Sequence, residues 1–165
     1  MCIRDRNRSH TKDQAIKCVA NAQALGFDNI TIDLIYGVPN QTNEEWRKNL
    51  LQAISLNIQH ISSYCLTVEP KTTLAHMVKQ KQVFQVTDEF AEKQFYMLIE
   101  TLAENGFEQY EISNFAKDGF ISLHNSNYWK GVEYIGLGPS AHSFDGMSRQ
   151  WNVANNNRYM KSLEN

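Results

Sequence analysis

The strand–helix–strand pattern over residues 29–68 constrains the fold more than any other feature of the sequence. Residues 29–36 are a short, β-branched and almost wholly apolar run that ends at Gly37, as in a strand buried on both faces. A capping box then opens a helical apolar stripe over 42–56, and residues 60–68 have a second strand pattern. Because the connections are short, the pattern predicts a parallel βαβ unit with a right-handed crossover.

Periodicity and capping residues predict further elements on both sides of this unit. They are helices over about 12–25 and 88–104, a third strand over 109–113, a loop over 114–131, a short strand over 134–139 and part of a helix over 158–163. Strands alternating with helices favour an α/β fold with a parallel sheet covered by helices. Residues 1–6 match no periodicity and are interpreted as a non-native leader.

The composition excludes several classes of partner. The 165-residue chain has 16 Lys and Arg against 18 Asp and Glu, so its net charge of -2 gives no basic field for nucleic acid or an anionic membrane. No apolar run reaches the roughly 18 residues of a membrane span and no signal-peptide pattern is present, so we expect a cytoplasmic protein. The three cysteines, Cys2, Cys18 and Cys65, fit no disulfide scaffold, zinc site or iron–sulfur spacing.

Ligands of parallel α/β folds bind at the carboxyl ends of the strands, which makes polar residues there candidates for a site. Asp33 interrupts an apolar strand, and a buried carboxylate requires a partner, which is a basic side chain, a helix end or a ligand. Thr67 and Glu69 alternate on one face of the next strand, although Glu69 before Pro70 is equally typical of a loop.

The loop around His124 is a third candidate. Within six residues it combines an imidazole, two amides and the rings of Tyr128 and Trp129, which suits a planar metallo-macrocycle. The alternative is that His124 has a structural role, with its hydrogen bonds made within a packed loop. His142 could equally be a structural histidine that bonds to the backbone of its loop. Gly136 and Gly138 do not form a dinucleotide fingerprint, since the third glycine and the following helix are missing.

Five ordered segments carry a resemblance to a known family, and a sixth, HNSNYW at 124–129, points to one of its branches. The five are RSHT at 8–11, NITIDLIYGVPNQT at 29–42, HISSYCLTVE at 60–69, YEISNFA at 110–116 and YIGLGPSAHS at 134–143. Together they resemble the oxygen-independent coproporphyrinogen III oxidase family of radical S-adenosylmethionine (SAM) proteins. The HNxxYW pattern is similar to that of the haem-chaperone branch of this family.

This resemblance implies a fold and a set of site residues. The fold would be the second half of a partial, open (β/α) barrel over 7–142, with 143–165 beginning a connection to a further domain. Arg8, Asp33, Ile35 and Thr67 match positions that contact SAM in the family. His124 would ligate the haem iron or lie beside it, within the motif completed by Asn125, Tyr128 and Trp129.

One family feature is missing from the sequence. The C-x-x-x-C-x-x-C motif, whose thiolates hold a 4Fe–4S cluster, is absent, and the three cysteines of this chain cannot replace it. The resemblance thus implies an interior piece whose cluster belongs to the full-length protein only. No catalytic residue is expected in this piece, and we do not expect it to generate a radical alone.

The resemblance favours one function and leaves two alternatives open. The first is a cytoplasmic haem chaperone that binds SAM and haem and passes haem to a client protein. The second is an oxidase that decarboxylates coproporphyrinogen III to protoporphyrinogen IX. The third is a non-catalytic half-barrel that depends on another chain.

Overall fold

Threonine caps set where the long helices of the chain begin. The computed structural model describes residues 10–164, so Arg8, Cys2 and the leader over 1–6 lie outside the described residues. Helices α1 (Lys12–Ala24) and α2 (Asn43–Ser55) both start with a capping box, and Thr87 caps α4 (Asp88–Ala103). These three helices confirm the prediction from capping residues. A short helix, α3 (Thr73–Lys79), was not predicted from the sequence.

The sheet of the first unit has the strand order β1-β2-β4-β3. Strands β1 (Thr31–Tyr36) and β2 (His60–Cys65) pair with each other in parallel, and α2 connects them along the chain. This confirms the βαβ unit. Strand β4 (Asn114–Ala116) runs antiparallel to β2, and β3 (Glu108–Gln109) runs antiparallel to β4. The sheet is therefore mixed, and the expectation of a wholly parallel sheet is wrong.

Of the third predicted strand, over 109–113, only Gln109 lies in a strand, and residues 110–113 form the turn of a hairpin between β3 and β4. The N–H of Tyr110 donates to the carbonyl of Asn114, and the N–H of Asn114 donates to the carbonyl of Glu111, so the chain reverses between β3 and β4. Because strands this short leave almost no alternation to detect, the pattern could not mark where the chain turns. The reversal is also what makes β4 antiparallel to β2.

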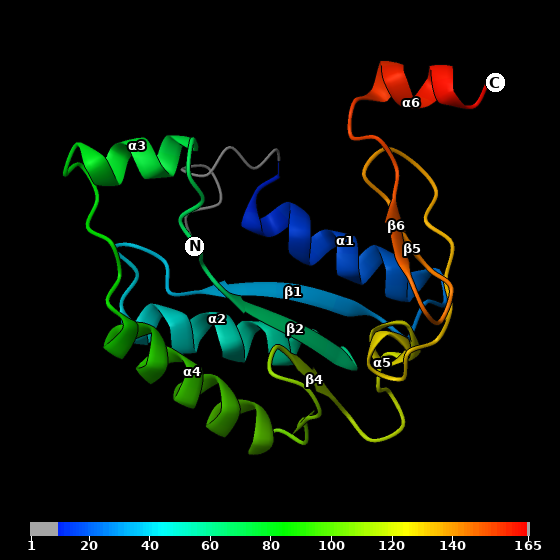
Figure 1. Cartoon of the computed structure of the whole chain (residues 1–165). Coiled ribbons are helices and arrows are strands. Elements are labelled where there is room, and N and C mark those ends of the chain that lie inside the picture. Colours follow the sequence, from blue (N-terminus) through cyan, green and yellow to red (C-terminus); the bar gives the residue numbers. More distant parts are fainter. Residues whose placement is uncertain (1–9, 165) are drawn as a thin grey trace. The chain divides into compact units, whose positions relative to one another are not determined.

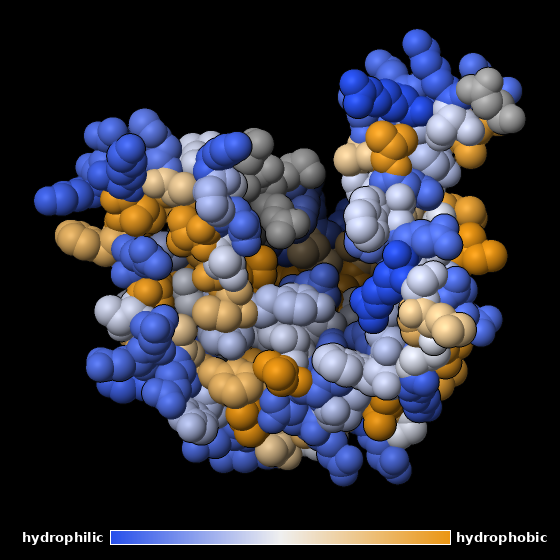
Figure 2. Space-filling view, in the orientation of Figure 1, coloured by the Kyte–Doolittle hydropathy of each residue, from blue (hydrophilic) through white to orange (hydrophobic). Residues whose placement is uncertain are grey.

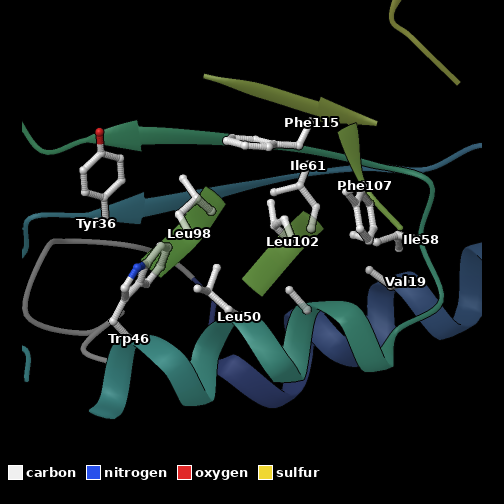
Figure 3. Packing of buried hydrophobic residues seen from close by; sticks show 11 residues of the cluster. Val19, Tyr36, Trp46, Leu50, Ile58, Ile61, Leu98, Leu102, Phe107 and Phe115 are labelled. Atoms are coloured by element: carbon white, nitrogen blue, oxygen red, sulfur yellow. The ribbon is translucent and has the colours of Figure 1, made fainter. Parts of the chain in front are cut away.

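The hydrophobic core lies between one face of the sheet and the helices (Figure 3). Trp46 and Leu50 of α2 pack with Leu98 of α4 against Ile61 of β2, and all four are at most 1% exposed. By the usual area relation, burying each such side chain contributes about 1.5–3 kcal/mol. Asp33, on the other face of the sheet, is exposed, so the expectation that β1 is buried on both faces is wrong.

The chain divides into two compact units between Ile121 and Ser122. The second unit contains α5 (Leu123–Trp129), a hairpin of β5 (His142–Phe144) and β6 (Arg149–Trp151), and α6 (Asn156–Ser162), as Figure 1 shows. Residues 134–139, predicted as a strand, pair only through an isolated bridge between Tyr134 and Phe144.

The second unit buries little apolar surface. Its surface carries Trp151 at 70% exposure and Leu137 at 85%, and hydrophobic residues lie among hydrophilic ones on the visible face (Figure 2). The loop expected over 114–131 contains β4 and α5, because Ser122 caps a helix despite the poor helix propensity of Asn and Ser. Within residues 10–164, no helix is both long enough and apolar enough to cross a bilayer.

Candidate functional site

Asp33 and Ile35 lie on the sheet face opposite the helices. Ile32 and Leu34 pack against the core, so the residues that alternate with them point the other way. The Asp33 carboxylate is exposed and makes no hydrogen bond or ion pair with another described residue. Because the Asp33 carboxylate is exposed, it does not need a partner within the protein. Its oxygens are available to accept hydrogen bonds from hydroxyl or amine groups of a ligand.

A hydrogen-bonded network that does not include Asp33 lies on the same sheet face. Ser62 of β2 is the register partner of Asp33, and its Oγ donates to Asn114 Oδ1 at 2.7 Å. Asn114 Nδ2 in turn donates to Glu111 Oε2 at 2.6 Å. Ser62 and Asn114 are buried. This network ties β2 to β4 and to the turn before β4, on the sheet face that also carries Asp33.

The buried imidazole of His60 lies at the start of β2 on this face. A hydrogen bond of 2.7 Å joins its Nε2 to the Tyr110 hydroxyl, while its buried Nδ1 has no partner among the described residues. Burial lowers the pKa of His60, and the negative charges of Asp33 and Glu111 oppose this shift. The ring is thus held neutral near pH 7, at the end of the strand away from its carboxyl terminus.

Thr67 lies just beyond the carboxyl end of β2. The N–H of Leu66 donates to the Tyr36 carbonyl at 2.9 Å, so the pairing of β1 and β2 ends one residue before Thr67. Thr67 is exposed and outside the strand, which corrects the expectation that it alternates with Glu69 on a strand face. Glu69 is a loop residue whose carbonyl accepts from the Thr72 cap of α3.

The HNxxYW residues lie on helix α5 of the second unit, not in a loop. His124 and Tyr128 are four positions apart and therefore share a helix face, where their rings meet edge to face at 5.2 Å. His124 is exposed and makes no hydrogen bond to another described residue. Its nitrogen lone pair is therefore accessible to a metal ion.

Asn125 and Trp129 occupy a neighbouring part of the same helix. The N–H of Asn125 donates to the Ser122 cap, and the Trp129 ring is 77% exposed with no ring partner among the described residues. An indole this exposed offers a flat apolar surface to a ligand. His142, by contrast, is in β5, with its ring 6.1 Å from that of Trp151.

A run of four aromatic rings, here called the aromatic ladder, extends from the motif. It consists of His124, Tyr128, Tyr134 and Phe144, with successive centroid distances of 5.2, 5.1 and 6.2 Å. The ladder joins α5 to the β5–β6 hairpin. An open hollow of about 750 Å³ lies beside the last two rings of the ladder.

The two cysteines among the described residues do not form a metal site. Cys18 and Cys65 are both free, and within residues 10–164 no three His, Cys, Asp or Glu side chains are placed to hold a metal ion. Local desolvation and the charge of Asp88 raise the pKa of the Cys65 thiol, which disfavours the thiolate that metals bind.

Sequence reasoning missed the hydrogen-bonded network and the second half of the ladder. For the network a signal existed, since His60, Ser62 and Tyr64 are polar at every second position of the strand. For Tyr134 and Phe144 no local signal exists, because their contact arises from the bridge between two distant segments.

Comparison with known proteins gives close relatives but no matching family model. A protein of Mycobacterium tuberculosis named "Heme chaperone HemW" is 32% identical over 157 residues, which cover 95% of this chain and 40% of the relative. The zebrafish (Danio rerio) "Radical S-adenosyl methionine domain-containing protein 1, mitochondrial" is 35% identical over 140 residues, 85% of this chain and 32% of its own length.

The chain belongs to the HemW-like family of radical SAM proteins. The resemblance given by the sequence motifs is thereby confirmed. The chain spans 40% of the length of the M. tuberculosis HemW, so it corresponds to a part of these relatives.

A solved structure shows the same fold. The coproporphyrinogen III oxidase HemN of Escherichia coli, described as a radical SAM enzyme, superposes with a TM-score of 0.76 at 21% identity, covering 98% of this chain and 40% of the HemN chain. The expected partial barrel of the radical SAM type is confirmed in this form, with the mixed sheet described above.

Proposed function

We propose that the protein carrying this chain is a haem chaperone that binds haem at His124. The observation that supports this most directly is the accessible imidazole of His124 on α5, in edge-to-face contact with Tyr128, on a short helix that also carries the exposed ring of Trp129. Imidazole is a common axial ligand of haem iron, and flat aromatic side chains pack well on a porphyrin. The name of the HemW relatives agrees with this cargo.

The proposal includes a SAM site on the first unit. Asp33 would accept hydrogen bonds from the two ribose hydroxyls, with Ile35 about 7 Å further along the same strand face beside the adenine. Thr67, at the carboxyl edge of β2, would contact the nucleoside from the neighbouring strand. Arg8 would pair with the methionine carboxylate. When bound next to a reduced 4Fe–4S cluster, SAM supplies a radical. The residues of this chain would bind and orient the SAM molecule.

Transfer of haem to a client protein and a cytoplasmic location are further parts of the proposal. Haem held at an exposed helix is accessible to a second protein without opening a core, since His124 and Trp129 are both exposed.

Haem titration of the full-length protein tests the central claim. We expect a shifted Soret band for the wild type and at least about tenfold weaker binding for His124→Ala, because the iron loses its ligand. His76→Ala, which removes an exposed histidine of α3, is the matched control and should bind as the wild type. Equal affinity and spectra for wild type and His124→Ala would refute the ligand role.

SAM binding provides an independent test of the first unit. Asp33→Asn removes the charge and one acceptor oxygen, so we expect about tenfold weaker SAM binding by calorimetry, in line with a charge-assisted hydrogen bond. Asp28→Asn, an exposed change just before β1, should leave the affinity unchanged. Unaltered SAM affinity in Asp33→Asn would favour a half-barrel without this site.

A further inference from the structure

The aromatic ladder ends at an arginine that the family motifs do not include. Arg149 of β6 places its Cζ 5.5 Å from the centroid of the Phe144 ring, within the range of a cation–π contact. The two residues are register partners in the β5–β6 hairpin, so their side chains emerge on the same face. The guanidinium is therefore held at the far end of the ladder from His124.

The turn between the two strands fixes this position. Asp145 accepts hydrogen bonds from the N–H groups of Met147 and Ser148 and from the Ser148 hydroxyl, at 2.6 to 2.9 Å. These bonds lower the pKa of Asp145 to about 2, so the turn is closed at all physiological pH values. Arg149 follows directly after this closed turn.

Arg149 has no anionic partner in the part of the chain that the structure describes. The residue is exposed and forms no ion pair with any residue between 10 and 164. Asp145, four positions earlier, uses its oxygens within the turn. A guanidinium that is positioned by an aromatic ring but lacks a carboxylate is suited to bind a carboxylate of a ligand in bidentate fashion.

We propose that Arg149 binds a carboxylate side chain of the porphyrin whose iron is held by His124. This inference rests on the proposed haem-binding function and specifies its ligand class, a metalloporphyrin with free carboxylates. Iron lies at the centre of the macrocycle and the carboxylates lie at its edge, so their partner lies apart from the iron ligand. The ladder connects the two residues through successive ring contacts of 5.2, 5.1 and 6.2 Å, and Arg149 lies over the last ring.

The surrounding charges favour the same orientation. Glu133 and Asp145 line the hollow next to Tyr134 and Phe144, and their negative charges repel a porphyrin carboxylate placed there. Arg149 gives the carboxylate a favourable position on the hairpin face. The macrocycle edge that carries the carboxylates is therefore directed to Arg149.

The test compares two porphyrins and three variants of the full-length protein. The probes are iron protoporphyrin IX and its dimethyl ester, which has the same ring and iron but no carboxylates. We expect Arg149→Gln to weaken binding of the free acid about tenfold and to leave binding of the ester within about twofold of wild type. Arg149→Lys should recover part of the loss, because it restores charge without the planar fork.

Arg158→Gln is the matched control, since it removes the same charge from an exposed position of α6 and should bind both porphyrins as the wild type. Equal weakening of acid and ester by Arg149→Gln, or no weakening of either, would overturn the inference. If the wild type binds haem and loses it in His124→Ala while Arg149→Gln has no effect, only the inference fails. If the wild type shows no Soret shift at all, the proposed function fails with it.

Discussion

The backbone N–H of Gly37 donates to Gln94 Oε1 at 2.8 Å, which links the turn after β1 to the middle of α4. Gln94 is fully buried, and its Nε2 has no partner among the described residues. The carbonyl of the same residue accepts from the indole Nε1 of Trp46 at 3.0 Å. Gln94 thus ties the turn that follows Asp33 and Ile35 to both helices beneath it.

Replacing Gln94 by leucine should destabilise the chain by about 1–3 kcal/mol. The substitution leaves the buried N–H of Gly37 without an acceptor, and this loss exceeds the gain from removing the unpaired amide nitrogen. Chemical denaturation monitored by circular dichroism measures the change in the free energy of unfolding. Gln85→Leu, at an exposed loop position, should change it by less than about 0.5 kcal/mol. A Gln94→Leu protein as stable as the wild type would show that the turn does not depend on this bond.

Tyr128 should orient the imidazole of His124. In Tyr128→Leu the edge-to-face contact at 5.2 Å is lost, and we expect haem affinity to fall about two- to tenfold, as for the loss of one aromatic pair. Tyr128→Phe keeps the ring and should retain the wild-type Soret band and affinity. Tyr96→Leu, which removes an exposed tyrosine of α4, is the control. Equal binding by the leucine and phenylalanine variants would refute the orienting role.

Capping residues and short apolar runs in the sequence predicted the helices and strands that depend on neighbouring residues of the chain. The capping boxes at Thr11 and Thr42 and the apolar run before Gly37 fix α1, α2 and β1 within two residues of their observed bounds. The hydrogen bond of His60 to Tyr110 joins residues 50 positions apart, and no periodicity indicates it.

Other features were predicted wrongly or not at all. Helix α5 begins at the Ser122 cap although its Asn- and Ser-rich sequence has low helix propensity, so propensity alone did not indicate it. Asp33 was correctly singled out as unusual, but for a wrong reason: its strand has one open face, so the charge is exposed and not buried. The roles of Asp33, Ile35, Thr67 and Arg8 toward SAM and of the α5 motif toward haem remain predictions.

Gly37→Ala should destabilise the chain more than Gly26→Ala. Both glycines have positive φ, +68° and +88°, so both alanines strain the backbone. Only at position 37 would the added Cβ meet another group, the Cys65 Sγ at 3.0 Å. We expect an additional loss of about 1 kcal/mol in thermal or chemical denaturation. The double variant Gly37→Ala/Cys65→Ala should recover this part, and failure to recover it would locate the strain elsewhere.

The stability of the chain should fall as the pH drops below 6.5. Burial lowers the pKa of His60 from its ordinary value of 6.5, so between the two values the unfolded chain binds more protons than the folded one. The stabilising contribution of the neutral His60 is therefore fully present above pH 6.5. As the pH falls from 6.5 to the pKa of His60 in the folded chain, this contribution is lost, and the free energy of unfolding decreases by up to about 1.4 kcal/mol per pH unit. Denaturation at several pH values measures this slope, which His60→Gln should reduce and the exposed control His76→Gln should retain. Because His60→Gln also breaks the bond to Tyr110, NMR titration of the wild-type imidazole provides a second readout. A pKa at or above 6.5 in the folded chain would contradict the prediction, since the charges of Asp33 and Glu111 would then outweigh burial.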